Sequence, residues 1–403
     1  MPEPMSGKRI VLGVTGGIAA YKAADLTSKL VQLGADVHVV MTASALQFVQ
    51  PMTFQALTRN PVYSGVFDGW SGDDAGHVTL AAQADAVVVA PATANSIAKA
   101  AHGFAEDMLG AVLLATEAPI IVAPAMEHHM IHHEATQANL DTLRSRGAVI
   151  VDPETGRLAS GASGDGRLAT VERILYATRC AVGSGGELAG KRIVVTAGGT
   201  HEAIDPVRFI GNNSTGTMGI AIALAASDRG ADVTLVVGPS VGSVPEGMNV
   251  VRVVSTRELQ HAVEQEVSDA DVLIMAAAVA DFRPEFMTDE KVKKTDDENH
   301  WDLRLVKNPD ILASIHEEQL IKIGFAAETS NLLANAQAKL ERKGLAMIIA
   351  NDAVATIGSP DSTATIITRG SDAPEQLPEM SKSDLAVRIM DRVVNLLDTQ
   401  SVD

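Results

Sequence analysis

The sequence is poor in cysteine and in aromatic residues, and it contains no long apolar run. Cys180 is the single cysteine among 403 residues, which excludes an intrachain disulfide and a multi-cysteine metal site. Aromatic residues make up 3% of the chain, and no apolar segment approaches the length that spans a bilayer. The first residues lack the apolar core of a signal peptide. These absences predict a cytoplasmic protein in a reducing compartment, without a membrane partner.

Basic residues are also in deficit, with 32 Lys and Arg against 50 Asp and Glu and a formal net charge of −18. Because this field repels a phosphate backbone, nucleic acid is excluded as a partner, although a local basic groove can still hold one small anion. A chain of 403 residues with 46% apolar content exceeds what one hydrophobic core usually serves. We therefore expect more than one domain.

What the chain does contain is a series of short apolar runs rich in Val, Ile and Ala. In the first half these runs predict strands at residues 9–14, 35–41, 85–90, 119–123 and 148–151. Helical patterns lie between most of them. Short buried strands alternating with helices predict a parallel, doubly wound sheet.

The second half begins with a similar pattern. The flexible sequence Gly-Ser-Gly-Gly at residues 183–186 predicts a boundary, and we place the two domains at residues 1–189 and 190–403. Residues 191–196 then repeat the pattern of residues 8–13. Two explanations of this repeat remain open: the two domains share an ancestor, or any two Rossmann-like domains begin in this way. Further strands are predicted at 271–275, 322–325 and 346–349, and a final helix at 382–397. The fold class is therefore α/β, with two doubly wound Rossmann-like domains of mainly parallel strands.

Each predicted domain has a glycine turn after its first strand, at residues 15–18 and 197–200. Glycine lets backbone N–H groups at a helix N-terminus approach a phosphate, although such a turn also serves as a plain tight connection. Neither turn is the G-x-G-x-x-G fingerprint, and the second strand of each domain ends without an acidic residue. A nicotinamide-dependent oxidoreductase is therefore disfavoured.

In the first half, four motifs occur in a characteristic order, at residues 13–22, 77, 90–95 and 123–126. Over residues 7–180 the chain thereby resembles the flavin-binding cysteine decarboxylase family, which includes phosphopantothenoylcysteine decarboxylase. The resemblance implies an FMN-dependent decarboxylase with His77 as a catalytic residue. It also implies FMN contacts from Gly17, Thr42, Ser44, Thr93, Asn95 and Ala125, and substrate contacts from Met126, Glu127 and Arg167.

Two departures from the family pattern concern catalysis. Glu127 stands where the family has a carboxylate-binding Asn, and a fixed negative charge facing a carboxylate substrate is unfavourable. Ser160 stands where many members have a proton-donating Cys, and a hydroxyl is a much poorer acid than a thiol. Two hypotheses follow: a variant decarboxylase with another proton donor, or a flavin-binding domain with impaired turnover or a regulatory role.

The second half contains six uncommon strings in order, at residues 196–200, 205–216, 276–282, 291–294, 308–311 and 324–329. From about residue 190 to 400 it is similar to phosphopantothenate–cysteine ligase. The resemblance implies a CTP-dependent ligase in which Asn212 stabilises an acyl-cytidylate and Arg208 contacts substrate, although residue chemistry alone does not separate CTP from ATP. Lys291 would neutralise the triphosphate together with Mg²⁺, or it belongs to a solvated basic stretch.

The same resemblance assigns a nucleotide site to a larger set of residues. Lys339 and Lys343, four residues apart on a predicted helix, either face this site or lie on an exposed face. The expected nucleotide contacts are Ser214, Gly216, Ala276, Ala277, Ala278, Asp281, Lys291, Asn308, Pro309, Asp310, Ile311, Phe325, Lys339 and Lys343.

Together the two halves predict a bifunctional enzyme of coenzyme A biosynthesis. It would ligate 4'-phosphopantothenate with cysteine and then decarboxylate the product to 4'-phosphopantetheine. The resemblance further implies a homo-oligomer with flavin sites between subunits, in which trimeric decarboxylase units and dimeric ligase units combine into a larger assembly such as a dodecamer.

Overall fold

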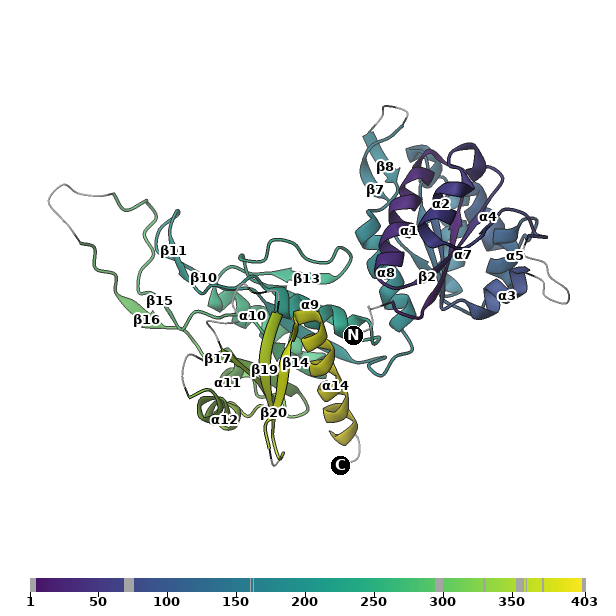
Figure 1. The fold of residues 1–403 in the computed structure, drawn as a ribbon. Helices are drawn as coiled ribbons and strands as arrows, with labels where there is room; N and C mark the ends of the chain where they lie inside the picture. Colours follow the sequence, from purple (N-terminus) through teal and green to yellow (C-terminus); the bar gives the residue numbers. More distant parts are fainter. Residues whose placement is uncertain are drawn as a thin grey trace. The chain divides into compact units, whose positions relative to one another are not determined.

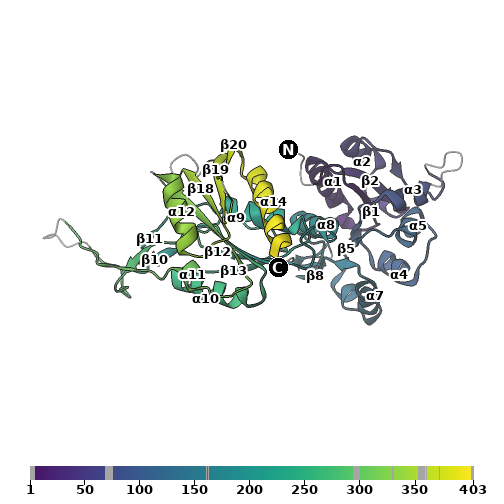
Figure 2. The same cartoon turned by 90° about the horizontal axis from the view of Figure 1, so that it is seen from below.

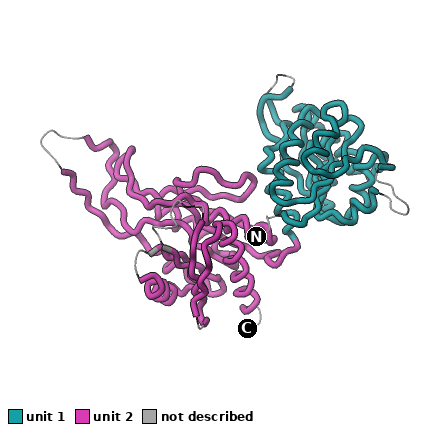
Figure 3. Tube along the Cα trace, in the orientation of Figure 1, with its two compact units in different colours: residues 1–184 teal, residues 185–403 magenta. Residues whose placement is uncertain are grey.

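The computed structural model describes residues 5–400, except 69–75, 160, 162, 294–299, 329–330, 353–358, 360 and 372. The chain divides into two compact units, Met1–Ser184 and Gly185–Asp403 (Figure 3). Among the described residues, no helix combines the length and the apolar character that crossing a membrane requires.

The first unit contains a six-stranded, fully parallel sheet. Its strand order is β3-β2-β1-β4-β5-β6 (Figure 1). This is the doubly wound order: β2 and β3 are added on one side of β1, and β4, β5 and β6 on the other side. The strands are β1 (Arg9–Val14), β2 (Asp36–Met41), β3 (Val62–Tyr63), β4 (Ala86–Ala92), β5 (Ile120–Pro124) and β6 (Val149–Ile150). All five strands predicted in this half are therefore confirmed, with small shifts at their ends.

Helices cover both faces of this sheet, which explains why its strands are nearly continuous apolar runs. One face packs against α1 (Lys22–Gln32), α2 (Pro51–Thr58) and α8 (Val171–Gly183). The other face packs against α3 (Gly76–Gln83), α4 (Ala94–His102), α5 (Met108–Ala115) and α7 (Glu134–Ser145). The short helix α6 (His128–Ile131) adds Ile131 to this second core, and β7 (Glu154–Arg157) and β8 (Ser163–Arg167) form a separate antiparallel hairpin.

The second unit repeats the same strand order and extends it. Its sheet runs β13-β12-β9-β14-β17-β18-β19-β20; the first six strands pair in parallel, whereas β19 pairs antiparallel with both β18 and β20. The parallel strands are β9 (Arg192–Ala197), β12 (Asp232–Val237), β13 (Asn249–Arg252), β14 (Val272–Met275), β17 (Ile321–Glu328) and β18 (Met347–Asp352). The fold class of two doubly wound, mainly parallel domains is confirmed.

The antiparallel strands are β19 (Asp361–Thr368) and β20 (Glu375–Ser381), and the sequence analysis does not predict either of them. β20 lies at the sheet edge, and its polar sequence includes a proline and buries no residue fully. An edge strand of this kind has no apolar alternation to detect.

Two helical layers enclose this second sheet. One face packs against α10 (Thr256–Glu266), α11 (Ile311–Ser314) and α12 (Leu332–Arg342). The other face carries α9 (Thr217–Ser227) and α14 (Lys382–Gln400), which contact one another (Figure 2). Two small hairpins, β10 (His201–Ala203) with β11 (Phe209–Gly211) and β15 (Phe282–Pro284) with β16 (Leu305–Lys307), lie side by side at one end of this unit (Figure 1).

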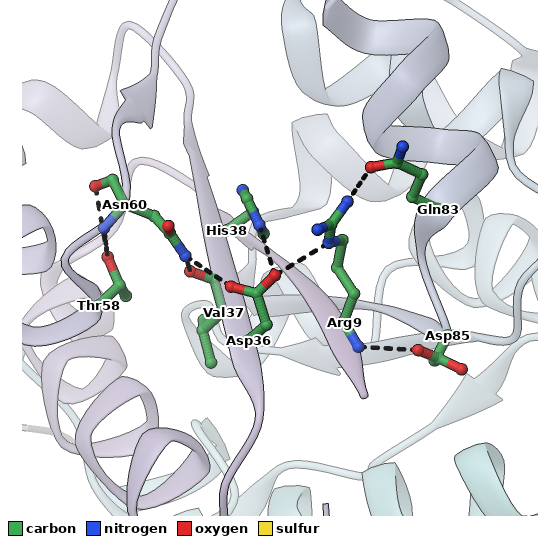
Figure 4. A network of polar contacts seen from close by, with 8 residues as sticks. All are labelled: Arg9, Asp36, Val37, His38, Thr58, Asn60, Gln83 and Asp85. Carbon is green, nitrogen blue, oxygen red and sulfur yellow. Dashed lines mark hydrogen bonds and ion pairs between the residues drawn. The ribbon is translucent and has the colours of Figure 1, made fainter. Parts of the chain in front are cut away.

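A charged clamp joins strands at the amino ends of the first sheet (Figure 4). The Asp85 carboxylate, just before β4, accepts from the backbone N–H of Arg9 at 2.8 Å and pairs with the Lys8 ammonium at 3.1 Å. The Arg9 guanidinium in turn contacts Asp36 at 3.0 Å, and Asn60 donates to the same carboxylate. The clamp thus joins the amino ends of β1, β2 and β4.

The second sheet has the same clamp. Asp271, just before β14, accepts from the backbone N–H of Arg192 at 2.8 Å and pairs with Lys191 at 3.1 Å. The Arg192 guanidinium contacts Asp269 at 2.5 Å and lies 3.9 Å from Asp232. The repeated sequence pattern therefore corresponds to a repeated set of contacts.

Candidate active sites

The first unit has a cavity of about 1020 Å³ at the carboxyl ends of its parallel strands. In doubly wound folds ligands bind at this edge, where the strand order reverses. Each residue predicted to contact FMN lies within three residues of the carboxyl end of one strand: β1, β2, β4 or β5. All of these residues line the cavity: Gly17, Thr42, Ser44, Thr93, Asn95 and Ala125.

Hydrogen bonds and close packing hold the turns around this cavity together. The buried Thr15 hydroxyl donates to the Pro91 carbonyl at 2.7 Å and accepts from the Thr93 N–H at 3.0 Å, which joins the ends of β1 and β4. A Cβ on Gly16 would lie 2.2 Å from the Cβ of Ser44, whereas one on Gly17 would lie at an ordinary 3.6 Å from Thr93. Only glycine therefore fits at position 16.

The predicted substrate residues Met126, Glu127 and Arg167 line the same cavity. Glu127 is the N-cap of α6, and its carboxylate accepts from the His129 N–H at 2.7 Å. One carboxylate oxygen is thus turned toward the helix, which reduces the conflict with an anionic substrate.

Three further cations line this cavity that the sequence analysis does not assign to it: Lys22, Lys99 and Arg157. Lys99 is paired with Glu106 at 2.9 Å. The hydrogen bond that Lys99 donates to the Glu106 carboxylate raises the pKa of Lys99, and the negative charges of Asp107 and Glu106 add to this effect. Lys22 continues the glycine-turn motif and could have been found from it, whereas Arg157 lies outside every motif.

Neither predicted catalytic residue of this unit is among the described residues that line the cavity. His77 begins α3, and it is not among the residues that line the cavity. Its Nδ1 is buried and makes no hydrogen bond within the described part of the chain. Ser160 lies outside the described residues, although its neighbours Leu158 and Ala159 line the cavity.

The second unit has a cavity of about 780 Å³ at the equivalent edge of its sheet. It contains the predicted catalytic Asn212 and every predicted nucleotide contact except Lys291. These contacts are Ser214, Gly216, Ala276, Ala277, Ala278, Asp281, Asn308, Pro309, Asp310, Ile311, Phe325, Lys339 and Lys343.

The alanine loop after β14 is fixed by the glycine turn after β9. The Thr196 hydroxyl accepts from the Ala277 N–H and the Thr200 hydroxyl accepts from the Ala280 N–H, each at 3.0 Å. The Asn308 side chain donates to the Ala280 carbonyl at 2.8 Å. Small side chains on a fixed backbone leave room for a planar ring to approach closely.

Asn212 and Gly216 also line this cavity. The Asn212 amide donates one N–H to the Val279 carbonyl at 2.9 Å, and an amide has two N–H donors. Gly216 is the N-cap of α9 with a φ of 74°, and a Cβ there would lie 2.4 Å from the Val241 side chain. Position 216 therefore requires glycine.

Five cations line this cavity: Lys307, Lys339, Arg342, Lys343 and Lys382. Lys339 donates to the Phe325 carbonyl at 2.6 Å, and Lys343 pairs with Asp310 at 2.7 Å. Burial lowers the pKa of Lys382, since it penalises the charged form. In an acidic protein this concentration of positive charge favours an anionic ligand. Lys307 adjoins the 308–311 motif, but no sequence signal brings Lys382 from α14 to this site.

Lys291 and Arg208 lie outside the residues that line either cavity. Lys291 is exposed, and the adjacent Val292 carbonyl accepts from the Arg208 guanidinium. Arg208 also pairs with Asp205 at 3.1 Å and stacks over Trp301 with 5.0 Å to the ring centroid. Arg208 therefore contacts the segment between β15 and β16 that contains Lys291, which we call the arm.

Two protein-family models match the chain. One is described as "Flavoprotein" and covers residues 1–182, and the other as "DNA/pantothenate metabolism flavoprotein C-terminal domain" and covers residues 188–397.

Curated relatives match along nearly the whole length. Three of them are named "Coenzyme A biosynthesis bifunctional protein CoaBC". The protein of Vibrio vulnificus strain CMCP6 is 42% identical over 400 residues, with 98% of this chain and 99% of that protein covered. The Mycolicibacterium smegmatis protein is 42% identical over 415 residues, with 98% and 99% covered. The Bacillus subtilis strain 168 protein is 43% identical over 400 residues, with 97% and 98% covered.

Proposed function

The chain belongs to the family of coenzyme A biosynthesis bifunctional proteins, and we propose that its two units divide the two reactions between them. Residues 185–403 would ligate 4'-phosphopantothenate with cysteine, and residues 1–184 would decarboxylate the product to 4'-phosphopantetheine. The observation that supports this division is the presence of two separate cavities, each lined by most of the residues expected for one reaction.

For the ligation we propose CTP as the activating nucleotide. The substrate carboxylate attacks the α-phosphorus of CTP and pyrophosphate leaves; the cysteine amine then attacks the acyl carbon of the acyl-cytidylate and CMP leaves. The Asn212 amide has a second N–H besides the one donated to Val279, and it can donate to the charge that develops in these steps without adding charge of its own.

The five cations around this cavity would hold the triphosphate. Mg²⁺ would neutralise phosphate charge, and Asp281 and Asp310 are the carboxylates among the described lining residues that could hold it. The loop of Ala276, Ala277 and Ala278 would face the base. Lys291, on the adjacent arm, would reach the phosphates from the same chain or from a second copy.

For the decarboxylation we propose FMN in the cavity of the first unit. The glycine turn leaves no room for a side chain at position 16, and the flanking residues are small and polar, which suits a flat ring and its phosphate. When bound, FMN supplies the oxidation of the cysteine part of the substrate and the later return of its electrons. Arg167 would bind the substrate's negative charge, and Met126 would pack against its apolar part.

His77 is proposed to act on the substrate of a second copy of the chain, because it does not line the cavity of its own unit. The neighbouring Val78 is 50% exposed, so apolar surface beside His77 is available for contact between copies. Mixing His77→Ala protein with Arg167→Ala protein should then restore carbon dioxide release that neither variant shows alone. Absence of such complementation would contradict a shared site.

The decisive experiment supplies phosphopantothenate, cysteine, CTP and Mg²⁺ to the purified protein, with ATP in a parallel reaction. Pyrophosphate and carbon dioxide are followed separately while the flavin spectrum is recorded. Both products with CTP support the full proposal. Pyrophosphate without carbon dioxide in flavin-loaded protein would favour an active ligase fused to an impaired or regulatory flavin domain, as Ser160 allows. The absence of both pyrophosphate and carbon dioxide would refute the proposed function.

A further inference from the structure

Three potential metal ligands of the first unit lie together outside the cavity lining: His128, His132 and Asp165. One ligand atom from each residue lies within 4.8 Å of the other two. The histidines are four residues apart, on α6 and directly after it, and their ring centroids are 4.6 Å apart. Asp165 comes from β8 of the hairpin, so the cluster joins two separate elements.

The carboxylate of this cluster is held in place by existing hydrogen bonds. Asp165 Oδ2 lies 2.9 Å from His132 Nε2, and Asp165 Oδ1 accepts from the Thr155 hydroxyl at 2.5 Å. The backbone N–H of Asp165 donates to His128 Nδ1 at 3.2 Å, so this nitrogen directs a lone pair toward the hairpin. Such outer contacts orient ligands before a metal binds.

We propose that His128, His132 and Asp165 bind a divalent transition-metal ion, with Zn²⁺ as the best fit. Two imidazoles and one carboxylate form the mixed nitrogen and oxygen set that Zn²⁺ accepts at about 2.0–2.2 Å per bond in tetrahedral geometry. The ion would replace the proton shared by His132 and Asp165, and it would displace the Asp165 N–H from His128 Nδ1 so that the lone pair of this nitrogen binds the metal. Water, or the adjacent His129 whose ring centroid is 5.4 Å from that of His128, would complete the coordination.

The ion would fasten the β7–β8 hairpin to α6, and both elements border the first cavity. Met126 and Glu127, directly before α6, line it, as do Gly166 and Arg167 of the hairpin. The Met126 N–H already donates to the Gly166 carbonyl at 3.0 Å. Metal binding would therefore slow opening of the hairpin and hence substrate entry. This consequence rests on the proposed decarboxylase function, whereas the metal site does not.

The test titrates Zn²⁺ into the untagged full-length chain, stripped beforehand with a chelator, against a competing metal indicator. We expect one ion per chain, with His132→Gln and Asp165→Asn each weakening binding by about 10-fold or more. His102→Gln, an exposed histidine of the same unit outside the cluster, should bind as the parent protein does. Equal affinity in all four proteins would overturn the site.

A second readout is independent of catalysis. Arg157 on β7 is exposed, so trypsin should cleave there, and Zn²⁺ should slow this cleavage in the parent protein but not in Asp165→Asn. Carbon dioxide release from supplied phosphopantothenoylcysteine should fall in parallel, while pyrophosphate release stays unchanged. Bound Zn²⁺ without protection of the hairpin would overturn the fastening. If Zn²⁺ protects the hairpin from trypsin but the metal-free protein releases no carbon dioxide, the result would instead count against the proposed decarboxylase function.

Discussion

At the scale of single residues, the first cavity depends on how closely two turns approach one another. Thr15 joins the turns after β1 and β4 through its buried hydroxyl, and Gly16 brings the turn after β1 against Ser44. Neither residue needs to touch a ligand to matter, because the distance between the turns sets the width of the cavity.

Gly16→Ala and Gly17→Ala should therefore behave differently. At position 16 the added methyl group would lie 2.2 Å from Ser44 Cβ, and we expect a loss of about 1–3 kcal/mol in the free energy of unfolding together with lower flavin content. At position 17 the nearest atom is 3.6 Å away, on Thr93, and the backbone is extended, so the expected change is about 0.5 kcal/mol or less. Urea unfolding followed by flavin fluorescence measures both. Equal losses would contradict this view of the turn.

Asn212 offers a second test at this scale. Asn212→Asp replaces a donor by a negative charge at the wall of the second cavity, so pyrophosphate release should fall by about 10²-fold or more. Carbon dioxide release from supplied phosphopantothenoylcysteine should not change, and Asn395→Asp, on the exposed side of α14, serves as the matched control. A ligase with near-normal turnover would remove Asn212 from the proposed mechanism.

At the scale of elements, the arm that contains Lys291 is attached to the second unit through Asp205. Burial alone would raise the pKa of this carboxyl group. The N–H groups of Val207, Arg208 and Val292, together with the Arg208 guanidinium, outweigh burial and hold the pKa below its usual value. Asp205 thus joins the turn between β10 and β11 to the arm between β15 and β16.

Asp205→Asn should loosen this attachment and misplace Lys291. We expect kcat/KM for pyrophosphate release to fall by about 10- to 100-fold, the order of effect that a small misplacement produces. Because the folded-state pKa is lowered, the stabilisation by Asp205 is present above its unfolded pKa of about 3.9 and is lost as pH falls through the folded value.

The stability difference between Asp205→Asn and the parent protein should therefore be largest near neutral pH and disappear in strong acid. Urea unfolding at several pH values measures it. Asp398→Asn, at an exposed carboxylate of α14, is the control and should alter neither quantity. A difference that grows on acidification would contradict the assignment.

The same scale explains what could be predicted from the sequence. Buried parallel strands such as β1 and β9 are apolar because helices cover both of their faces, so their sequences identify them. β20 and β7 contain no fully buried residue and give no such signal. Site residues that directly follow strands, such as Thr93 and Asn308, could be located from motifs. Lys382 could not, because it reaches the second cavity from the far end of the chain through tertiary packing.

At the scale of the whole molecule, the boundary between the units can be located by packing. Leu188 is fully buried, and its N–H donates to the Arg229 carbonyl at 3.0 Å. Glu187 lies 3.5 Å from the Arg229 guanidinium. Residues 187–189 therefore pack with the second unit, and the flexible sequence ends before them.

A fragment of residues 185–403 should accordingly fold and release pyrophosphate. A fragment of residues 190–403 should lose about 2–5 kcal/mol of its free energy of unfolding, because removing Leu188 leaves a cavity. Urea unfolding of the two fragments, followed by circular dichroism, makes the comparison. Equal stabilities would show that Leu188 contributes little to this unit.

The charged clamp occurs at the amino ends of both sheets, whereas both cavities lie at the carboxyl ends. A parallel sheet thus separates, along a single strand, the residues that bind ligand from the residues that fasten the strands together. Selection can exchange the loops at one end while the other end preserves the architecture. The two units are consistent with such a history, since one framework has acquired two unrelated chemistries. For the engineer, the clamp is a place to adjust thermal tolerance without disturbing either reaction.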